Sequence, residues 1–293
     1  MITVIGSINM DIVCQTEVFP KQGETVLGNR FETVPGGKGA NQAVAATRLG
    51  GKVKMVGAVG QDSFGPVLID ILKNEKMDVS SVQMAPTSTG IANILLFEQD
   101  NRIIVVPGAN NYVTPQLVDA NEQVIKESKL VVMQLEIPVE TVEHTLKLCK
   151  KHGVPVLMNP APARNFKTEW MEDITYLTPN ETECELIFHE QIETSLQAYP
   201  NKLIVTLGDE GAMYHNGEHI VKVAGFRTTA IDTTGAGDTF NGAFAHKICE
   251  GADVEEAVQF ANVAASLSVE KFGAQGGMPT IEQVEARVEE SRL

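Results

Sequence analysis

Residues 233–239 read Thr-Thr-Gly-Ala-Gly-Asp-Thr, a run of small residues that leads into an aspartate. Apolar residues recur at helical spacing from Phe240 to Ile248, which predicts that this run opens a helix. The first amides of a helix have no intrahelical partner and carry the positive end of the dipole, so they attract an anion. Asp238 would stand beside this anion hole, where a carboxylate can take a proton from an attacking hydroxyl. An ordinary helix N-terminus with an acidic first turn is the alternative.

A second glycine cluster, residues 35–42, reads Pro-Gly-Gly-Lys-Gly-Ala-Asn-Gln and also precedes a predicted helix. It is not a Walker A loop, because Glu32 stands where that motif has glycine and Gly39 follows the lysine in place of Ser or Thr. Its glycines would let backbone amides approach a small polyhydroxylated ligand, with Asn41 bonding the hydroxyls. A tight turn with a solvated lysine remains the alternative.

Polar residues also follow two predicted strands. Asn9 and Asp11 alternate along an extended segment after the first strand, so both can point to one face. Glu136 follows the strand at 131–135 in the same way. Ligands of open α/β sheets bind outside the carboxyl ends of the strands, which makes all three candidate ligand-binding residues. An Asx-rich turn and a surface carboxylate are the respective alternatives.

Residues 180–183 read Asn-Glu-Thr-Glu and carry two interpretations. Asn180 with Glu183 three residues later is a capping box, which alone would explain both residues. A carboxylate near a phosphate site can also hold the water shell of Mg²⁺, which keeps several of its waters in proteins. The two interpretations are compatible.

The predicted elements alternate between strands and helices, which indicates an α/β fold with a mostly parallel sheet and helices on both faces. The helix at 63–74 has Asp62 as its cap, and the helix from Pro138 ends before Gly153. Apolar runs predict strands at 3–5, 53–59, 130–135, 154–158, 175–177 and 203–207.

Two regions break the alternation. Strand candidates at 12–16, 25–27 and 31–34 follow one another without a helix. Residues 91–97 and 103–106 indicate a hairpin with a Gln-Asp-Asn turn at 99–101. Antiparallel strands inserted in this way predict a small second sheet that covers a site as a lid. An extension of the main sheet's edge is the alternative.

The composition excludes several classes of protein. A net charge of −15 over 293 residues argues against nucleic acid or an anionic membrane surface as the main partner. The N-terminus has no secretory signal, no run is long enough to span a membrane, and four scattered cysteines indicate a reducing, cytoplasmic setting. His215 and His219 flank an Asn-Gly pair that predicts a hairpin turn, so a metal role for them is disfavoured.

The motifs gain weight from their joint order: G-S-x-N-x-D, G-G-K-G-A-N-Q-A, N-P-A-P-A-R, T-P-N-E-x-E, D-T-T-G-A-G-D-T-F-N-G and F-G-A-Q-G. In this order the sequence resembles the ribokinase-like family of sugar and nucleoside kinases over essentially the whole chain. The resemblance implies one three-layer α/β domain, residues 1–293, with a mostly parallel central sheet. It also implies a β-sheet lid inserted at about 11–35 and 90–107, through which two copies form a homodimer.

The resemblance further implies transfer of the γ-phosphoryl group of ATP to a sugar hydroxyl, O5 of D-ribose. Asp238 would be the general base, and the amides of Gly235, Ala236 and Gly237 would form the anion hole. By match of motif, the sugar would be held by Asn9, Asp11, Gly37, Lys38, Asn41 and Glu136. The ATP site would comprise Asn180, Thr206, Leu207, Gly208, Asp209, Glu210, Gly211, Gly237 and Asn262.

Two cations also follow from the resemblance. Glu183 would lie near Mg²⁺ and hold it through water. A K⁺ ion beside the anion hole would be bound at Asp232, Thr234, Ser268, Lys271, Gly273 and Gly277, mostly through backbone carbonyls. Position 277 often carries serine in this family, and glycine stands here.

Three other functions stay open on the sequence. One is a related pentose, hexose or nucleoside kinase of the same family. Another is a non-catalytic sugar- or nucleotide-binding protein, against which the intact Asp238 speaks. A nicotinamide dehydrogenase would fit the alternation of elements, but the G-x-G-x-x-G fingerprint is lacking.

Overall fold

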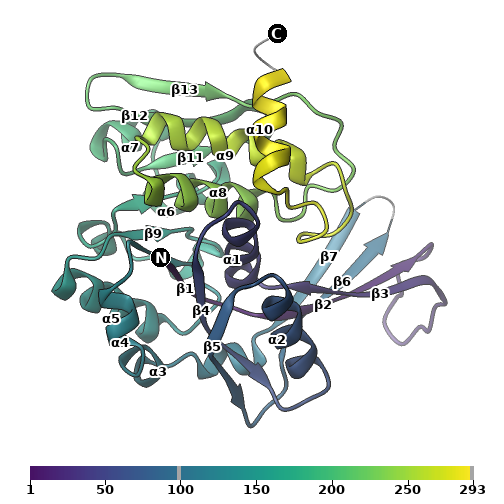
Figure 1. Cartoon of the computed structure of the whole chain (residues 1–293). Helices are drawn as coiled ribbons and strands as arrows, with labels where there is room; N and C mark the ends of the chain where they lie inside the picture. The colour runs from purple at the N-terminus through teal and green to yellow at the C-terminus, as the bar shows by residue number, and fades with distance from the viewer. Residues whose placement is uncertain (98–99, 291–293) are drawn as a thin grey trace.

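A six-stranded parallel sheet forms the centre of the molecule, in the order β10-β9-β8-β1-β4-β5. A computed structural model describes residues 1–97 and 100–290 (Figure 1). The strands are β1 (Ile2–Ile5), β2 (Asn9–Thr16), β3 (Gly28–Gly36), β4 (Val53–Gly60), β5 (Asp78–Ala85), β6 (Gly90–Phe97), β7 (Asp100–Val106), β8 (Leu130–Met133), β9 (Val156–Met158), β10 (Tyr176–Leu177), β11 (Ile204–Thr206), β12 (Gly211–His215) and β13 (Ile220–Ala224).

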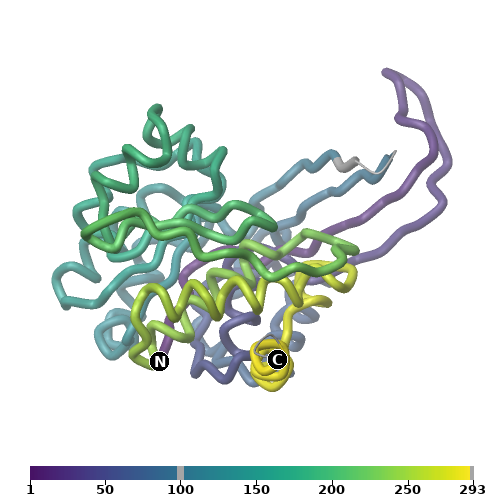
Figure 2. Tube along the Cα trace, turned by 90° about the horizontal axis from the view of Figure 1, so that it is seen from above, coloured from purple at the N-terminus to yellow at the C-terminus, as the bar shows by residue number. Residues whose placement is uncertain are grey.

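Helices cover both faces of this sheet. They are α1 (Lys38–Arg48), α2 (Phe64–Asn74), α3 (Pro115–Asp119), α4 (Glu122–Lys126), α5 (Val139–His152), α6 (Glu181–Phe188), α7 (Ile192–Ala198), α8 (Ala236–Glu250), α9 (Val254–Ser268) and α10 (Ile281–Glu290). In Figures 1 and 2, α1, α2, α8, α9 and α10 lie on one side of the sheet and α3 to α7 on the other.

The strands divide their side chains between two cores, as the two-residue period of a strand requires. Ile2 and Val4 of β1 belong to the core under α1 and α8. Ile5 of the same strand belongs to the core on the α5 face. β8 alternates likewise, with Val132 in the first core and Met133 in the second. This pattern confirms the predicted three-layer α/β fold.

A three-stranded antiparallel sheet, β11-β12-β13, continues the central sheet at its β10 edge. Single parallel bridges join Leu177 to Leu203 and Asn180 to Thr206. The predicted strand at 203–207 contains β11. This strand joins the central sheet through the two bridges and pairs with β12 on its other side. The histidines at 215 and 219 flank the β12–β13 hairpin, whose turn was predicted: Asn216 Oδ1 accepts from His219 N at 2.9 Å.

The inserted strands form a separate four-stranded sheet in the order β3-β2-β6-β7, which projects from the body of the molecule (Figure 2). We call this sheet the lid. The predicted hairpin at 91–97 and 103–106 is the antiparallel pair β6–β7, and β2 pairs antiparallel with β3. β2 and β6 pair in parallel, so the sheet as a whole is mixed. The expected strand at 25–27 is a loop, because Gly23, with a φ of 78°, forms a turn there that delays pairing with β2 until Gly28.

The predicted turn at 99–101 was also wrong in part, since Asp100 and Asn101 pair with Phe97 and Leu96 as residues of β7. Gln99 lies outside the described residues.

The predicted helix caps are found. Asp62 Oδ1 accepts from the amides of Phe64 and Gly65 at 3.1 Å, and α5 ends at a left-handed Gly153. Within the described ranges, no helix combines the length and apolar character that crossing a membrane demands.

Candidate active site

Helix α8 begins after a left-handed glycine and places Asp238 in its first turn. Gly235 precedes the helix with a φ of 82°, a conformation that glycine adopts without steric cost. Space excludes a side chain there as well, because a β-carbon would lie 2.8 Å from the α-carbon of Ala274. Asp238 follows three residues later and is only 7% exposed. The turn itself therefore needs a small residue, independently of any ligand.

The amides of residues 235–237 at the start of α8 differ in their hydrogen bonding. Ala236 N donates to the Thr233 carbonyl oxygen at 3.2 Å. The amides of Gly235 and Gly237 have no acceptor within residues 1–97 and 100–290. A β-carbon on Gly237 would meet nothing within 4 Å. Two of the three amides expected to form an anion hole can thus donate to a ligand, at the positive end of α8.

Both carboxylate oxygens of Asp238 accept hydrogen bonds from α1. Asn41 Nδ2 donates to Oδ2 at 2.9 Å, and Gln42 Nε2 donates to Oδ1 at 3.0 Å. The two helices pack closely because small residues such as Ala45 and Gly242 meet where they cross. The second glycine cluster and the Gly-Ala-Gly-Asp run, 197 positions apart, therefore form one site.

A buried network of side-chain amides surrounds this contact. Gln134 Nε2 donates to Gln42 Oε1 at 2.6 Å, and Gln42 Nε2 also reaches Asn159 Oδ1 at 3.2 Å. Gln275 Nε2 donates to Asn41 Oδ1 at 3.0 Å. No role was predicted for these four amide side chains, Gln42, Gln134, Asn159 and Gln275. Two of them could have been recognised by their position in the sequence. Gln134 and Asn159 directly follow β8 and β9, at the carboxyl edge of the sheet where ligands bind.

Asp11 and Glu136 lie on the lid side of this network. The Asp11 carboxylate packs on Gly36, where a β-carbon would stand 2.4 Å from both of its oxygens. Glu136 Oε2 accepts from Ser7 Oγ at 2.5 Å and from the amide of Lys38 at 3.1 Å. Glu136 therefore holds the start of α1 against the end of β1.

Asn9 is oriented by a second asparagine. Asn110 Nδ2 donates to Asn9 Oδ1 at 2.7 Å, and Asn110 Oδ1 accepts from the amide of Ile8 at 2.9 Å. Both asparagines are buried. The oxygen of the Asn9 side-chain amide thus already accepts a hydrogen bond. Its Nδ2 group remains as a donor for a ligand.

Four carboxylates surround one lysine in the site. Burial, followed by the charges of Glu136 and Asp238, raises the pKa of Asp11 to about 7, although Lys38 opposes this shift. Burial by itself lowers the pKa of Lys38, but Asp238, Glu136, Glu183 and Asp11 together outweigh it and the pKa is raised. Burial also raises the pKa of Glu183. The centre is therefore acidic, with one firmly protonated lysine.

A cavity of about 820 Å³ opens on the other side of the α8 N-terminus. Gly237, Thr206, Asn262 and residues 208–211 line it, as predicted for the ATP site. The segment from Phe226 to Thr228 forms a further part of its wall, which the sequence analysis did not identify. Such a volume is within the range of small-molecule sites and accommodates a nucleotide.

Two residues predicted for the ATP site do not line this cavity. Leu207 is buried in the core on the α5 face, because it lies between β11 and the 3₁₀ turn Gly208–Glu210. Asn180 caps α6: its Oδ1 accepts from Glu183 N at 2.8 Å, and its own N–H donates to Glu183 Oε2 at 3.0 Å. The predicted capping box is confirmed. Asn262 lines the cavity, yet its Nδ2 group donates to the carbonyls of Val223 and Ala224.

The residues predicted to bind a monovalent cation lie on two adjoining loops. Asp232 Oδ1 accepts from Thr234 N and its Oδ2 accepts from Gly273 N, both at 2.9 Å. Ser268 is the last residue of α9, and its backbone contacts Gly277. Lys271 follows on the exposed part of the same loop. The structure thus brings Asp232, Ser268 and the 273–277 segment together beside the start of α8.

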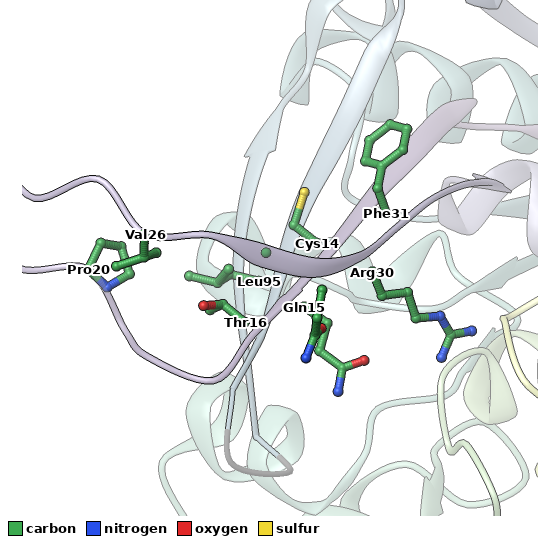
Figure 3. Close-up of a pocket in the computed structure, with 10 residues that line it drawn as sticks. Cys14, Gln15, Thr16, Pro20, Val26, Arg30, Phe31 and Leu95 are labelled. Carbon is green, nitrogen blue, oxygen red and sulfur yellow. The ribbon is translucent and has the colours of Figure 1, made fainter.

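A second pocket, of about 480 Å³, lies in the lid and away from Asp238. Figure 3 shows its lining side chains on β2, β3 and β6 and on the loop that carries Pro20 and Val26. Cys14, Gln15, Thr16, Arg30, Phe31 and Leu95 complete the labelled set. None of the residues predicted to bind sugar or nucleotide lines it, so we place the chemistry at Asp238 and not in this pocket.

Phosphoryl transfer asks a protein mainly for positioning and for stabilisation of charge, and the start of α8 offers both next to a nucleotide-sized cavity. This arrangement fits a small-molecule kinase. Residues 1–281 match the pfkB carbohydrate kinase family, and the chain belongs to that family. It is therefore an enzyme that phosphorylates a carbohydrate, as predicted.

Full-length relatives support the same class. The ribokinase of Lactococcus lactis is 48% identical over 294 residues, which cover 100% of this chain and 98% of that protein. The ribokinase of Bacillus subtilis is 50% identical over 97% of this chain and 98% of that protein. The structure of Arabidopsis thaliana ribokinase complexed with ribose and ATP superimposes with a TM-score of 0.89 at 33% identity, covering 97% of each chain. These similarities disfavour the non-catalytic and dehydrogenase alternatives.

Proposed function

We propose that this chain transfers the γ-phosphoryl group of ATP to O5 of D-ribose and releases D-ribose 5-phosphate and ADP. The observation that carries the proposal is the position of Asp238 between two regions. Its carboxylate contacts Asn41 at the sugar side, while the preceding Gly237 lines the nucleotide cavity. Ribokinases at 48% and 50% identity, and a related structure that contains ribose and ATP, support this choice of substrates.

The reaction moves one proton and one phosphoryl group. Asp238 takes the proton from O5 as the O5–Pγ bond forms. The bond from Pγ to the oxygen that bridges to the β-phosphate breaks, and ADP leaves with that electron pair. The amides of Gly235, Ala236 and Gly237 stabilise the charge of the transferring group, because they lie at the positive end of α8.

The sugar is proposed to bind between α1 and the base of the lid. Asp11 supplies its two carboxyl oxygens to vicinal hydroxyls, and Asn9 supplies a donor through Nδ2. Burial of the Asp11 carboxyl and the tight contact with Gly36 fix its position. The remaining sugar ligands are Gly37, Lys38, Asn41 and Glu136.

Two cations complete the proposed site. Mg²⁺ neutralises charge on the ATP phosphates when it is bound, and Glu183 is proposed to hold its water shell. Only Oε2 of that carboxylate is used by the capping box, which fits this role. K⁺ is proposed to bind at Asp232, Thr234, Ser268, Lys271, Gly273 and Gly277. Both oxygens of Asp232 already accept backbone amides, so this residue fits the ion through its carbonyl group.

A coupled kinase assay with ribose, 2-deoxyribose, fructose and adenosine tests the substrate. We expect the highest kcat/KM with ribose, and faster turnover with K⁺ than with Na⁺. A higher kcat/KM with another acceptor would contradict ribose as the substrate and favour a related sugar or nucleoside kinase. Equal rates in K⁺ and Na⁺ would contradict the proposed K⁺ site.

The general base is tested separately by Asp238→Asn. General base catalysis contributes roughly 10²- to 10⁴-fold, so kcat should fall by that factor. The affinity for ribose should change little, because the amide keeps the size of the carboxylate and the other sugar ligands are intact. Turnover near that of the wild type would refute the assignment of Asp238.

A further inference from the structure

Gln42 is a fully buried side chain whose polar atoms are all used within the protein. Its Nε2 donates to Asp238 Oδ1 at 3.0 Å and to Asn159 Oδ1 at 3.2 Å. Its Oε1 accepts from Gln134 Nε2 at 2.6 Å. A carboxylate only accepts hydrogen bonds, so the NH₂ end of the amide must face Asp238. Gln42 thus contacts the proposed base without a group left for a substrate.

Two acceptors fix this orientation of Gln42. Asp238 Oδ1 and Asn159 Oδ1 both accept from Nε2, and Asn159 Nδ2 in turn donates to the Thr178 carbonyl. If the Gln42 amide turned over, Oε1 would face both of these oxygens, which is repulsive, and a buried donor would lose its acceptors. Gln134 Nε2 adds a donor to Gln42 Oε1 from the carboxyl end of β8.

The two oxygens of Asp238 differ in consequence. Oδ1 is bonded to Gln42, which is committed to protein partners. Oδ2 is bonded to Asn41, which lies at the proposed sugar site and is itself oriented by Gln275. An oxygen that keeps a permanent donor is the poorer proton acceptor, since that hydrogen bond stabilises the negative charge on it. The oxygen whose donor can shift to a sugar hydroxyl is the better one.

We propose that Gln42 is a positioning residue that anchors Oδ1 of Asp238 and so leaves Oδ2 as the oxygen that takes the proton from the sugar. This inference rests on the proposed function, because it requires Asp238 to act as the base. It assigns no substrate contact to Gln42. The role is orientation of the carboxylate.

Gln42→Glu tests the proposal because it keeps the shape of the side chain and removes the donor. A second carboxyl group beside Asp238 favours protonation of the pair at working pH. We expect kcat at neutral pH to fall at least about 30-fold, with the KM for ribose within about threefold of the wild type. The acidic limb of the kcat–pH profile should move up by at least about one pH unit. Gln197→Glu, the same change on the exposed surface of α7, is the matched control and should leave the profile unchanged.

Gln134→Met is the second variant, in case a buried glutamate prevents folding. It removes the donor to Gln42 Oε1 and introduces no charge. We expect a smaller fall in kcat, roughly tenfold, with the acidic limb displaced in the same direction.

The outcomes separate this inference from the proposed function. If Asp238→Asn is inactive while folded Gln42→Glu has the wild-type kcat and pH profile, the role of Gln42 is refuted and the base assignment stands. If Asp238→Asn remains active, the proposed base itself fails. A fall in kcat without displacement of the acidic limb, in both Gln42→Glu and Gln134→Met, would show a merely structural role and would also overturn the proposal.

Discussion

The α-carbon of Gly277 packs on the backbone of Ser268, so closely that a β-carbon at residue 277 would lie 1.8 Å from the Ser268 carbonyl oxygen. The loop after α9 folds back on itself here, and Gly277 N donates to Gly273 O at 3.3 Å. Gly277, Ser268 and Gly273 all belong to the proposed K⁺ site. Glycine therefore fits this loop where serine, frequent in the family at this position, does not.

Gly277→Ser should lower both stability and activation by K⁺. The new β-carbon must displace the Ser268 carbonyl, one of the proposed ligands of the ion. Overpacking of this kind costs about 1–3 kcal/mol, which thermal unfolding measures as a lower Tm. Activity titrated with KCl should show a higher half-saturating concentration. Ala120→Ser, on the exposed C-terminal end of α3, is the control; equal Tm values and equal KCl titrations in all three proteins would contradict the prediction.

The raised pKa of Asp11 makes stability depend on pH in a defined window. The folded protein holds this proton up to a pH of about 7, whereas the unfolded chain releases it near pH 3.8, the ordinary pKa of the group. Between these values the native state binds more protons, so the free energy of unfolding falls as the pH rises. The stabilisation is complete below the lower value and is lost once the pH passes about 7.

Asp11→Asn should remove this dependence. We expect the variant to be more stable than the wild type at pH 8 by roughly 1–4 kcal/mol, with a difference that shrinks toward pH 4. Its KM for ribose should rise, because a proposed sugar ligand is lost. Urea unfolding at several pH values measures the effect, and Asp70→Asn on the exposed face of α2 is the control. A constant difference from pH 4 to pH 8 would show that Asp11 does not titrate in this window.

The architecture could be predicted from the sequence, and so could the two glycine-rich segments that form the site. Buried strands alternate with capped helices, so local patterns identified nearly every strand of the central sheet. The Gly-Ala-Gly-Asp run and the Gly-Gly-Lys-Gly cluster could each be interpreted alone, because helix N-termini have a local signature. Their contact, through Asn41 and Asp238, depends on how α1 crosses α8 and has no local signal.

The buried amide network and the pairing of the lid strands also depend on contacts between residues far apart in the sequence. Gln134 and Gln42 are 92 positions apart, and buried amides resemble surface ones in a sequence. The parallel pairing of β2 with β6 depends on the whole intervening segment from β3 to β5, so it has no local signal in the sequence. The side chain of Leu207 lies in the core while that of the preceding Thr206 lines the cavity, because neighbouring side chains point to opposite faces at the end of a strand.

Glu183→Gln separates the two roles proposed for the Asn180–Glu183 pair. The glutamine oxygen can still accept from Asn180 N, so the capping box and the Tm should be nearly unchanged. Loss of the charge should weaken Mg²⁺ binding, and we expect the half-saturating Mg²⁺ concentration to rise about three- to thirtyfold. Asn180→Ala is the counterpart, since it removes the cap and should cost about 1 kcal/mol of stability. An unchanged Mg²⁺ titration in Glu183→Gln would leave the residue with its capping role alone.

The lid carries apolar side chains that the body of this protein does not cover. Phe31 is 67% exposed, Ile104 66% and Val106 44%. Apolar residues in such number on one small sheet are typical of a protein–protein interface. We propose that a second copy of the chain covers them, as the family resemblance implies.

Ile104→Asp should therefore weaken the dimer. A charge in the middle of β7 would be buried without a partner in the interface, which costs several kcal/mol on association. We expect a shift from dimer to monomer in light scattering coupled to size-exclusion chromatography at micromolar concentration. Val67→Asp is the control, because Val67 is 48% exposed on α2, outside the lid. A wild-type protein that is already monomeric under these conditions, or an Ile104→Asp variant that stays dimeric, would rule out the lid as the interface.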